Sequence, residues 1–207
     1  MLLQVEGHER NKFDRYFKAM FRQRKQIFYD QKKWDVNIVD GCYEVYEFDR
    51  DDTCYLLALS DTNELVGSVR LISTVMPHML SGPFQTMFPD IGFSSPLIWE
   101  ATRFAVLPEA SAQLNHCSLA ARELMLGVVQ FGLNNGVRNI LGVYDAAMAR
   151  HYRRCGFTTI ELSRFRTALH GTVYAGLCPI SKTLESSVLA ATGLDSPNAA
   201  ALPARAA

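Results

Sequence analysis

The sequence has no excess of either charge, no long apolar run and no closely paired cysteines. Its 21 basic residues balance 21 acidic residues, so no overall field favours nucleic acid or an anionic membrane. No run approaches the roughly 18 apolar residues of a membrane span, and the first residues lack the features of a secretory leader. These absences predict a cytoplasmic protein that neither crosses a membrane nor binds nucleic acid.

Cysteine and histidine show none of the spacings that mark a metal site. The five cysteines are scattered and never arranged as Cys-x-x-Cys, which argues against both a disulfide framework and a zinc site. The five histidines have no ligand spacing either. We therefore expect reduced thiols and no metal.

The apolar content is large enough for one compact domain. Hydrophobic residues make up 48% of the 207 positions, which is sufficient for a substantial core. We assign residues 1–192 to a single domain. Residues 193–207 are rich in alanine and proline and contain almost no large apolar side chain, so we expect a disordered tail.

Hydrophobic periodicity predicts antiparallel strands in the first half of the chain and alternating helices and strands in the second. Apolar spacings of three and four predict helices over residues 13–28, 118–135 and 146–155. Short apolar runs predict strands over residues 42–48, 54–59, 65–72, 97–106, 139–144, 157–162 and 172–177. Residues 73–96 mix proline, glycine and large apolar side chains, which predicts a long covering loop. The expected fold is a three-layer α-β-α sandwich with a mixed, mostly antiparallel sheet.

Three arginines lie where apolar side chains are expected. Arg24 lies on the apolar face of the first helix, and Arg70 lies within an apolar strand. Arg103 lies beside Glu100 in a later strand that is otherwise apolar. Each has an ordinary alternative, because a long side chain can reach the edge of a core and a strand can have an exposed face. Buried charges are costly unless paired or bound to a ligand, so together they indicate a polar site.

Glu100 and Arg103 place a condition on their strand. Residues three apart on a regular strand point to opposite faces, so the two side chains share one site only if the strand contains a β-bulge. A bulge would also leave backbone amides free to receive a carbonyl oxygen that develops negative charge. The run over residues 99–106 is therefore the first candidate for an active site.

The other charged and aromatic residues would suit a small zwitterion. Arginines can hold a carboxylate, and Asp49, which follows a predicted strand, can hold an ammonium group. Phe28 and Trp34 could bind an aromatic base or a sulfonium ion by stacking and cation-π attraction. Each of these aromatic residues is nevertheless more often part of a core.

These positions resemble the acyl-homoserine lactone synthases of the LuxI type from about residue 24 to residue 177. The matching residues, in order, are Arg24, Phe28, Trp34, Asp49, Arg70, Phe84, Glu100 and Arg103. One position departs from the family, because the first acid of the usual pair aligns with Tyr46 and leaves Asp49 as the second. Glu44 or Glu47 could compensate, or the acid could be dispensable.

The resemblance implies a fold similar to the GCN5-related N-acetyltransferases and a reaction with two substrates. The amine of S-adenosylmethionine would take an acyl group from acyl-carrier protein. The methionyl carboxylate would then attack its own γ-carbon and release 5'-methylthioadenosine with the lactone. S-adenosylmethionine is a substrate in this scheme, and no cofactor is implied. Because an ammonium must lose a proton before it attacks a thioester, Glu100 would be the base, with Asp49 orienting the amine.

The resemblance also implies roles for the other matching residues. Arg70 and Arg103 would hold the charged groups of S-adenosylmethionine. The substrate pocket would be formed by Arg24, Phe28, Trp34, Phe84, Thr102 and Phe104. Gly142 aligns with a position where family members that accept 3-oxo chains often have threonine, so the missing hydroxyl argues against a 3-oxo substrate.

Two alternatives keep the same pocket. One is a generic N-acyltransferase of the same fold that uses acyl-CoA, although residues 107–118 contain no glycine for the usual pyrophosphate loop. The other is a module that binds an adenosyl ligand without turning it over. In the synthase interpretation, Arg150, Arg153 and Arg154 would dock the acidic carrier protein, and we expect the enzyme to act as a monomer.

Overall fold

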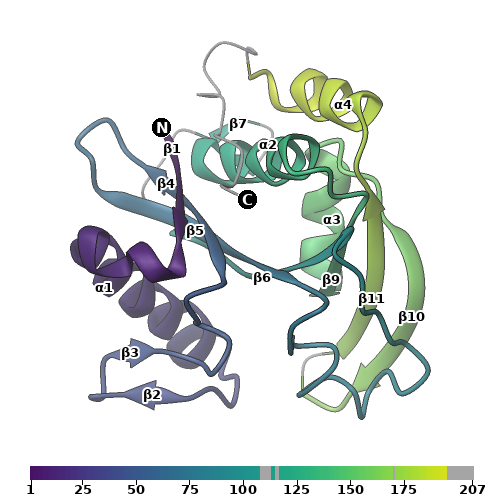
Figure 1. Cartoon of the computed structure of the whole chain (residues 1–207), viewed down its shortest axis with the longest axis horizontal. Helices are drawn as coiled ribbons and strands as arrows, with labels where there is room; N and C mark the ends of the chain where they lie inside the picture. Colours follow the sequence, from purple (N-terminus) through teal and green to yellow (C-terminus); the bar gives the residue numbers. More distant parts are fainter. Residues whose placement is uncertain (108–112, 115–116, 170, 195–207) are drawn as a thin grey trace.

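A seven-stranded sheet runs through the computed structural model, which describes residues 1–107, 113–114, 117–169 and 171–194. Across the sheet, the strands are β1 (Leu2–Glu6), β4 (Cys54–Leu59), β5 (Leu65–Ser73), β6 (Ile98–Val106), β9 (Asn139–Asp145), β11 (Gly171–Pro179) and β10 (Ile160–Thr167). β6 and β9 pair in parallel, and the other neighbours pair antiparallel (Figure 1). The predicted mixed, mostly antiparallel sheet is confirmed.

Helices cover both faces of this sheet. One layer is formed by a 3-10 helix η1 (Gly7–Phe13), α1 (Asp14–Arg24) and a π-helix η2 (Lys25–Gln31). The opposite layer is formed by α2 (Leu119–Asn134), α3 (Ala146–Arg154) and α4 (Lys182–Thr192), which packs on α2 (Figure 1). The three-layer α-β-α sandwich is therefore confirmed.

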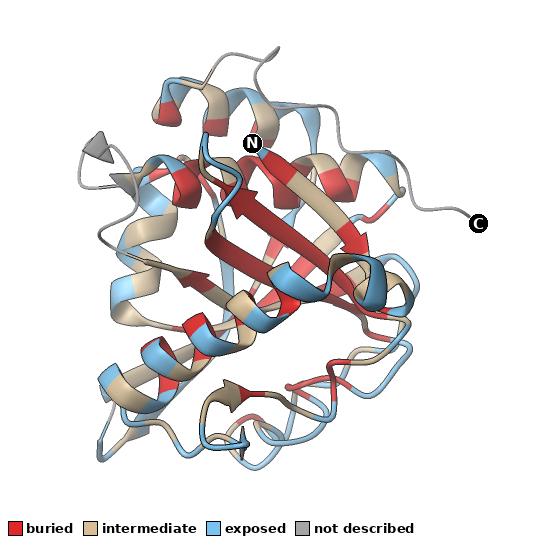
Figure 2. Cartoon of the chain, turned by 90° about the vertical axis from the view of Figure 1, so that its left-hand side faces the viewer, coloured by how far each residue is buried: buried red, intermediate tan, exposed pale blue. Residues whose placement is uncertain are grey.

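β4 lies between the two helical layers, which explains its unbroken apolar sequence. Leu56 and Ala58 pack in the core beneath α2, whereas Tyr55 and Leu57 pack against α1. Because both faces are covered, all six residues of the strand are buried. Figure 2 shows the resulting red strands in the middle of the sheet.

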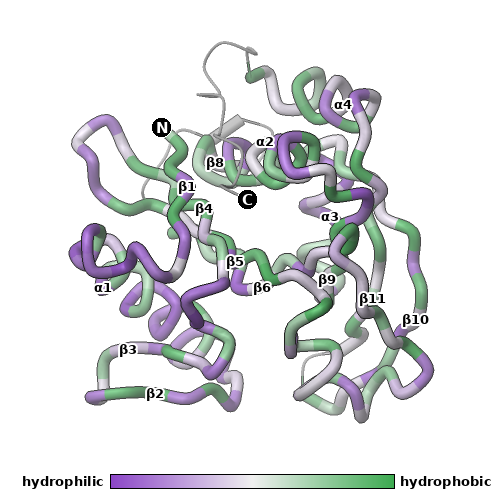
Figure 3. The backbone as a smooth tube through the Cα atoms, in the orientation of Figure 1, coloured by the Kyte–Doolittle hydropathy of each residue, from purple (hydrophilic) through white to green (hydrophobic). Residues whose placement is uncertain are grey.

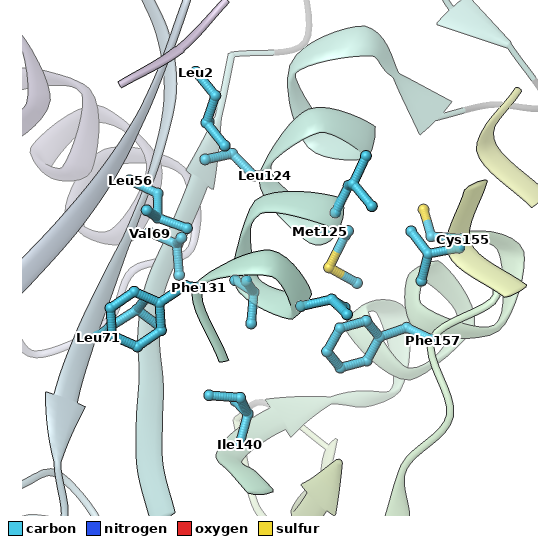
Figure 4. Packing of buried hydrophobic residues seen from close by; sticks show 14 of the residues in the cluster. Leu2, Leu56, Val69, Leu71, Leu124, Met125, Phe131, Ile140, Cys155 and Phe157 are labelled. Carbon is cyan, nitrogen blue, oxygen red and sulfur yellow. The ribbon is translucent and has the colours of Figure 1, made fainter. Parts of the chain in front are cut away.

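The larger core lies between the sheet and α2. Leu56, Val69 and Leu71 from the sheet pack in one cluster with Leu124 and Phe131 from the helix (Figure 4). Full burial of each side chain of this size contributes roughly 1.5–3 kcal/mol. This cluster therefore supplies much of the stability that holds the buried charges described below.

α1 buries only one stripe of its surface. Phe17, Met20 and Arg24 are buried at spacings of three and four, while much of the helix is hydrophilic (Figure 3). The helix continues as η2, so the predicted extent is close but the last turns are wider than an α-helix. π-helices often occur at functional sites, and η2 carries Phe28.

The segment between η2 and β4 differs from prediction. The strand predicted over residues 42–48 is wrong, because only β3 (Tyr43–Glu44) pairs, with β2 (Ile38–Val39). A turn follows, in which the amide of Asp49 donates to the carbonyl of Tyr46 at 2.8 Å. The amide of Tyr46 also donates to Asp49 Oδ2 at 2.9 Å. The turn carries Asp49 into the protein instead of along a sheet.

Other differences lie at the ends of the chain and at the sheet edge. β1 and α4 were not predicted, because each is short and its local pattern is weak. β10 begins later than the predicted strand over residues 157–162, and its exposed positions reflect its place at the edge of the sheet. Most of the predicted tail, residues 195–207, lies outside the described residues, so the tail and the one-domain assignment stay predictions.

β6 contains the β-bulge that the sequence requires. Ser68 and Arg70 on β5 are two residues apart, whereas their partners on β6, Ala105 and Thr102, are three apart. The extra residue falls at Arg103, whose φ of 53° lies in the left-handed region. Left-handed backbone costs a non-glycine residue roughly 1–2 kcal/mol, so the surrounding contacts must hold Arg103 in place.

The bulge reverses which side of the sheet the later residues of β6 face. Trp99 and Ala101 pack in the core beneath α2, as regular alternation requires. Phe104 packs against the same core, although it is three residues after Ala101. Ala105 consequently turns to the opposite face, where it packs with Phe28.

The sheet opens between β6 and β9. The two strands pair at only three positions, Ile98 to Glu100 with Asn139 to Leu141. Beyond that point, Thr102 and Arg103 of β6 and Val143 of β9 line a pocket instead of pairing. A ligand can therefore pass from one face of the sheet toward the other at this opening.

Candidate active site

A buried ionic cluster brings together two arginines and two acids predicted or considered from the sequence. Arg24 donates to both carboxylate oxygens of Asp49, from Nη1 at 2.8 Å and from Nη2 at 2.9 Å. Arg24 Nε donates to Glu44 Oε2 at 2.5 Å. Arg103 donates to Glu44 Oε1, from Nε at 3.0 Å and from Nη2 at 2.9 Å. Such charge-assisted pairs fix both the position and the plane of each guanidinium.

Glu44, one of the two acids considered in place of Tyr46, belongs to the ionic cluster. Its side chain is fully buried between Arg24 and Arg103, whereas Glu47 is exposed. The ring of Tyr46 instead covers Arg103, with 5.5 Å between the guanidinium carbon and the ring centre. The sequence offered Glu44 only as one of several alternatives, because its neighbours give no local sign that it turns inward.

Arg70 is buried but incompletely paired. Its Nε donates to Thr102 Oγ1 at 3.0 Å, and its Nη1 lies 3.2 Å from Asp49 Oδ1. Among the residues that the structure describes, neither Nη atom has a hydrogen-bond partner. Burial lowers the pKa of Arg70 despite Asp49. Buried donors without partners are costly, and Arg70 is therefore able to donate to further hydrogen-bond acceptors from both Nη atoms.

Glu100 lies on β6 beneath the loop that joins β5 to β6. Its Oε2 accepts from the amide of Met79 at 2.8 Å, and its Oε1 accepts from the amide of Leu80 at 2.9 Å. Burial raises the pKa of Glu100 to about 7, although these two amides oppose the shift. A carboxyl group that titrates near neutral pH is suited to accept and return a proton.

The two acids of the ionic cluster behave differently from Glu100. Burial alone would raise the pKa of Asp49, but Arg24 and Arg70 outweigh it and hold the pKa well below its usual range. Arg24 and Arg103 likewise lower the pKa of Glu44 against the effect of burial. Three arginines therefore face two ionised acids, which leaves a local excess of positive charge for a carboxylate substrate.

A pocket opens onto this cluster from the η2 side. Its empty space is about 1140 Å³ including the open mouth, and its lining includes Trp34, Tyr46, Phe84 and Arg103. Phe28 stacks on Trp34 with 5.1 Å between ring centres. We name this pocket the outer pocket. Its rings form flat apolar walls beside a cation, which suits an aromatic base.

A second pocket, the gap pocket, continues through the opening between β6 and β9. It shares Trp34, Phe84 and Arg103 with the outer pocket and adds Thr102 and Phe104. Its empty space is about 640 Å³. The structure thus brings the predicted pocket residues Phe28, Trp34, Phe84, Thr102, Arg103 and Phe104 to one connected space. Arg24 and Glu100 are buried and line neither pocket.

An apolar cavity lies on the α2 side of the sheet. Gly142 and Ile140 of β9 line it together with Met125 of α2 and Phe157, and its free volume is about 30 Å³, so an acyl chain would have to widen it. Phe104 belongs to both this cavity and the gap pocket. The cavity is therefore placed to take an apolar chain whose polar end remains in the gap.

The three arginines of α3 lie apart from the ionic cluster. Arg150, Arg153 and Arg154 are exposed, and the first two line an outer groove between α3 and β10. Within the described ranges, no group of three or more histidine, cysteine or acidic side chains could hold a metal ion. The same part of the chain contains no helix that is long and apolar enough to span a membrane.

Sequence comparisons match the chain to one family. The family model described as autoinducer synthase matches residues 6–188. The chain is 35% identical to the acyl-homoserine-lactone synthase of Rhizobium etli, over 81% of this chain and 78% of that protein. It is 30% identical to the acyl-homoserine-lactone synthase of Ralstonia solanacearum, over 89% of this chain and 90% of that protein.

Structure comparisons agree with the fold. The solved structure of MesI, a CoA-dependent acyl-homoserine lactone synthase, has a TM-score of 0.83 at 25% identity and covers 98% of both chains. An acyl-CoA N-acyltransferase from Pseudomonas aeruginosa has a TM-score of 0.55 at 16% identity, over 86% of this chain and 97% of that one, and shows the fold alone. The chain belongs to the autoinducer synthase family of acyl-homoserine-lactone synthases, which are acyltransferases that use S-adenosylmethionine as a substrate.

Proposed function

We propose that the chain moves an acyl group from acyl-carrier protein to the amine of S-adenosylmethionine at the opening between β6 and β9, with Glu100 as the base. The observation that carries this assignment is the buried carboxyl of Glu100, whose pKa is raised to about 7 and whose neighbour Ala101 lines both the apolar cavity and the gap pocket. A proton acceptor is needed where an amine meets a thioester. The adenosyl substrate would enter from the outer pocket and the acyl chain would occupy the apolar cavity.

The reaction would proceed in two steps. Glu100 takes a proton from the ammonium group directly or through water, and the free amine attacks the thioester carbon. A C–N bond forms, the C–S bond breaks, and the thiol leaves with a proton. The methionyl carboxylate then attacks its own γ-carbon, which breaks the bond to the sulfonium sulfur and releases 5'-methylthioadenosine. The bulge at Arg103 is suited to stabilise the oxygen of the first intermediate.

The arginines would hold the substrate carboxylate. The free Nη donors of Arg70 support this role, because a carboxylate would satisfy both. Both oxygens of Asp49 already accept from Arg24, and Tyr55 Oη donates to Oδ1 at 2.9 Å. These contacts favour Asp49 as the group that fixes Arg24 and Arg70, while its direct contact with the amine stays a prediction.

Substitution of Glu100 tests the assignment. Glu100→Gln should abolish formation of homoserine lactone and methylthioadenosine, measured by mass spectrometry, while S-adenosylmethionine binding measured by calorimetry remains largely intact. Full activity in this variant would exclude Glu100 as the base. Wild-type protein that binds S-adenosylmethionine but forms no lactone, with acyl donors supplied, would favour the alternative of a binding module.

We further propose that the arginines of α3 dock the acidic carrier protein. All three are exposed, and the outer groove that Arg150 and Arg153 line shares Phe157 and Thr159 with the apolar cavity. MesI is described as CoA-dependent, so the matched test compares acyl-carrier protein with acyl-CoA. Arg150→Glu with Arg153→Glu should lower kcat/KM for the carrier-protein donor roughly tenfold or more. Equal loss with both donors would argue against carrier-specific docking.

The cellular setting is proposed from the cysteines. Cys42 and Cys178 are free thiols, which supports a reducing cytoplasm. A monomeric enzyme stays a prediction. Light scattering of the active enzyme would test the monomer, and a dimer required for activity would overturn it.

A further inference from the structure

Tyr152 brings a hydroxyl into the apolar cavity between the sheet and α2. Two tyrosines line the cavity, and Tyr144 Oη donates to Thr159 Oγ1 at 3.2 Å. We find no hydrogen bond to Tyr152 Oη from any residue that the structure describes. Tyr152 is half-buried, and its hydroxyl is open to a ligand or to water from the cavity side.

The position of this hydroxyl is set by Gly142. A Cβ added to Gly142 would lie 3.8 Å from Tyr152 Oη and 4.0 Å from the carbonyl oxygen of Ala101. The glycine therefore leaves open the space between the tyrosine hydroxyl and β6. Its missing side chain does not make this part of the cavity apolar, because Tyr152 supplies a hydroxyl from α3.

Tyr152 is held rigidly where the two substrate spaces meet. Its ring packs edge-on against Tyr144 with 5.0 Å between centres and lies parallel to Phe157 with 5.3 Å between centres. Tyr152 lines both the apolar cavity and the gap pocket, which also contains Thr102. Burial raises the pKa of Tyr152, so the hydroxyl remains a proton donor at neutral pH. A fixed donor needs little further ordering to bind an acceptor.

We propose that Tyr152 Oη donates a hydrogen bond to an oxygen carried by the acyl chain close to the thioester. The favoured donors are then 3-oxoacyl or 3-hydroxyacyl groups, which share an acceptor near the reacting carbon, over plain acyl groups of equal length. This inference rests on the proposed function and names the substrate class for the same site. It also replaces the expectation from Gly142, which argued against 3-oxo chains.

The test compares matched acyl donors in Tyr152→Phe. Purified full-length enzyme is assayed with S-adenosylmethionine and with acyl-carrier protein that bears a 3-oxo, 3-hydroxy or unsubstituted chain of one length. The ratio of kcat/KM for an oxygenated donor to that for the plain donor should fall roughly tenfold in Tyr152→Phe, as loss of one buried hydrogen bond predicts. Tyr174→Phe is the control, because Tyr174 lines the outer groove but not the apolar cavity, and its ratio should not change.

Two results would overturn the proposal. One is a ratio in Tyr152→Phe within about twofold of the wild-type ratio, which would leave water as the partner of the hydroxyl. The other is a wild-type enzyme that uses the plain donor at least as well. If Tyr152→Phe does not fold, Gly142→Val serves instead, because its side chain would lie between the hydroxyl and the acyl group and should lower the same ratio. Failure to form any lactone would overturn the proposed function itself, whereas lactone with an unchanged ratio would overturn only the role of Tyr152.

Discussion

The carboxylate of Glu44 holds the guanidinium of Arg103, which lies 59 residues further along the chain. One oxygen of Glu44 accepts two hydrogen bonds from Arg103, and the other accepts from Arg24. A single acid therefore fixes one arginine of α1 and the bulged arginine of β6. Its removal would leave two buried cations short of a counter-ion.

Glu44→Gln should consequently lower the free energy of unfolding by about 3–5 kcal/mol, the usual effect of removing one partner from a buried ion pair. Denaturant unfolding measures this change. Glu47→Gln is the matched control, because Glu47 is exposed nearby and should change stability by no more than about 0.5 kcal/mol. Similar stabilities for the two variants would contradict a structural role for Glu44.

The pH dependence of the reaction should report Glu100. Because the pKa of this carboxyl is raised to about 7, the base is half protonated near neutral pH, and kcat/KM should rise with pH through that value and then level off. Steady-state rates between about pH 5.5 and pH 8.5 test this. The acidic limb should shift in Glu100→Asp, which keeps a carboxyl group at this position. A limb that stays unchanged in Glu100→Asp belongs to the substrate amine.

The free energy of unfolding should also depend on pH through Glu100. It should fall as pH rises, whereas kcat/KM should rise. The folded protein keeps a proton on Glu100 between pH 4.5, its ordinary pKa, and about pH 7, whereas the unfolded chain loses it. Stability from this group therefore falls as pH rises through that window. The free energy of unfolding of Glu100→Gln minus that of the wild type should therefore rise by about 2–3 kcal/mol between about pH 5 and pH 8, because only the wild type loses stability over this range. A constant difference would mean that the pKa is not raised.

Two substitutions at Arg103 should separate backbone strain from lost charge. Arg103→Gly and Arg103→Ala both remove the partner of Glu44, but only glycine adopts the φ of 53° without strain. The free energy of unfolding of Arg103→Gly should exceed that of Arg103→Ala by about 1 kcal/mol, and both variants should lose activity. Denaturant midpoints provide the measurement. Equal stability would show that the alanine variant has relaxed the bulge.

Much of the fold follows from local sequence patterns. β4, β5 and β6 are long apolar runs, and α2 and α3 begin at residues that cap them, Ser118 and Asp145. β1 could not be predicted, because five residues carry little periodicity. The strand is stabilised by pairing with β4, which lies more than 45 positions away in the sequence. Such long-range partners leave no mark on the local pattern.

The candidate site was predictable only in part, because some of its contacts also join residues that lie far apart in the sequence. Arg24, Arg70 and Arg103 are conspicuous because they interrupt apolar patterns, and the spacing of Glu100 and Arg103 already required a bulge. Glu44 lies in the run over residues 42–48, where two acids are interspersed with apolar residues and neither is distinguished from the other by the local pattern. Its role depends on a turn that brings it to two arginines from different layers, and the sequence does not contain that geometry in any local form.

The bulge lets β6 hold one residue that its packing does not count. If Arg103 took a regular strand conformation, Phe104 would turn toward Phe28 and Ala105 toward the core beneath α2, exchanging a large side chain for a small one on each face. Deletion of Arg103 would instead restore simple alternation with Phe104 and Ala105 on their present faces, because the bulged residue is the extra one. The packing of the strand on both layers therefore does not need Arg103, and the residue is kept in the strand by its contacts with the ionic cluster.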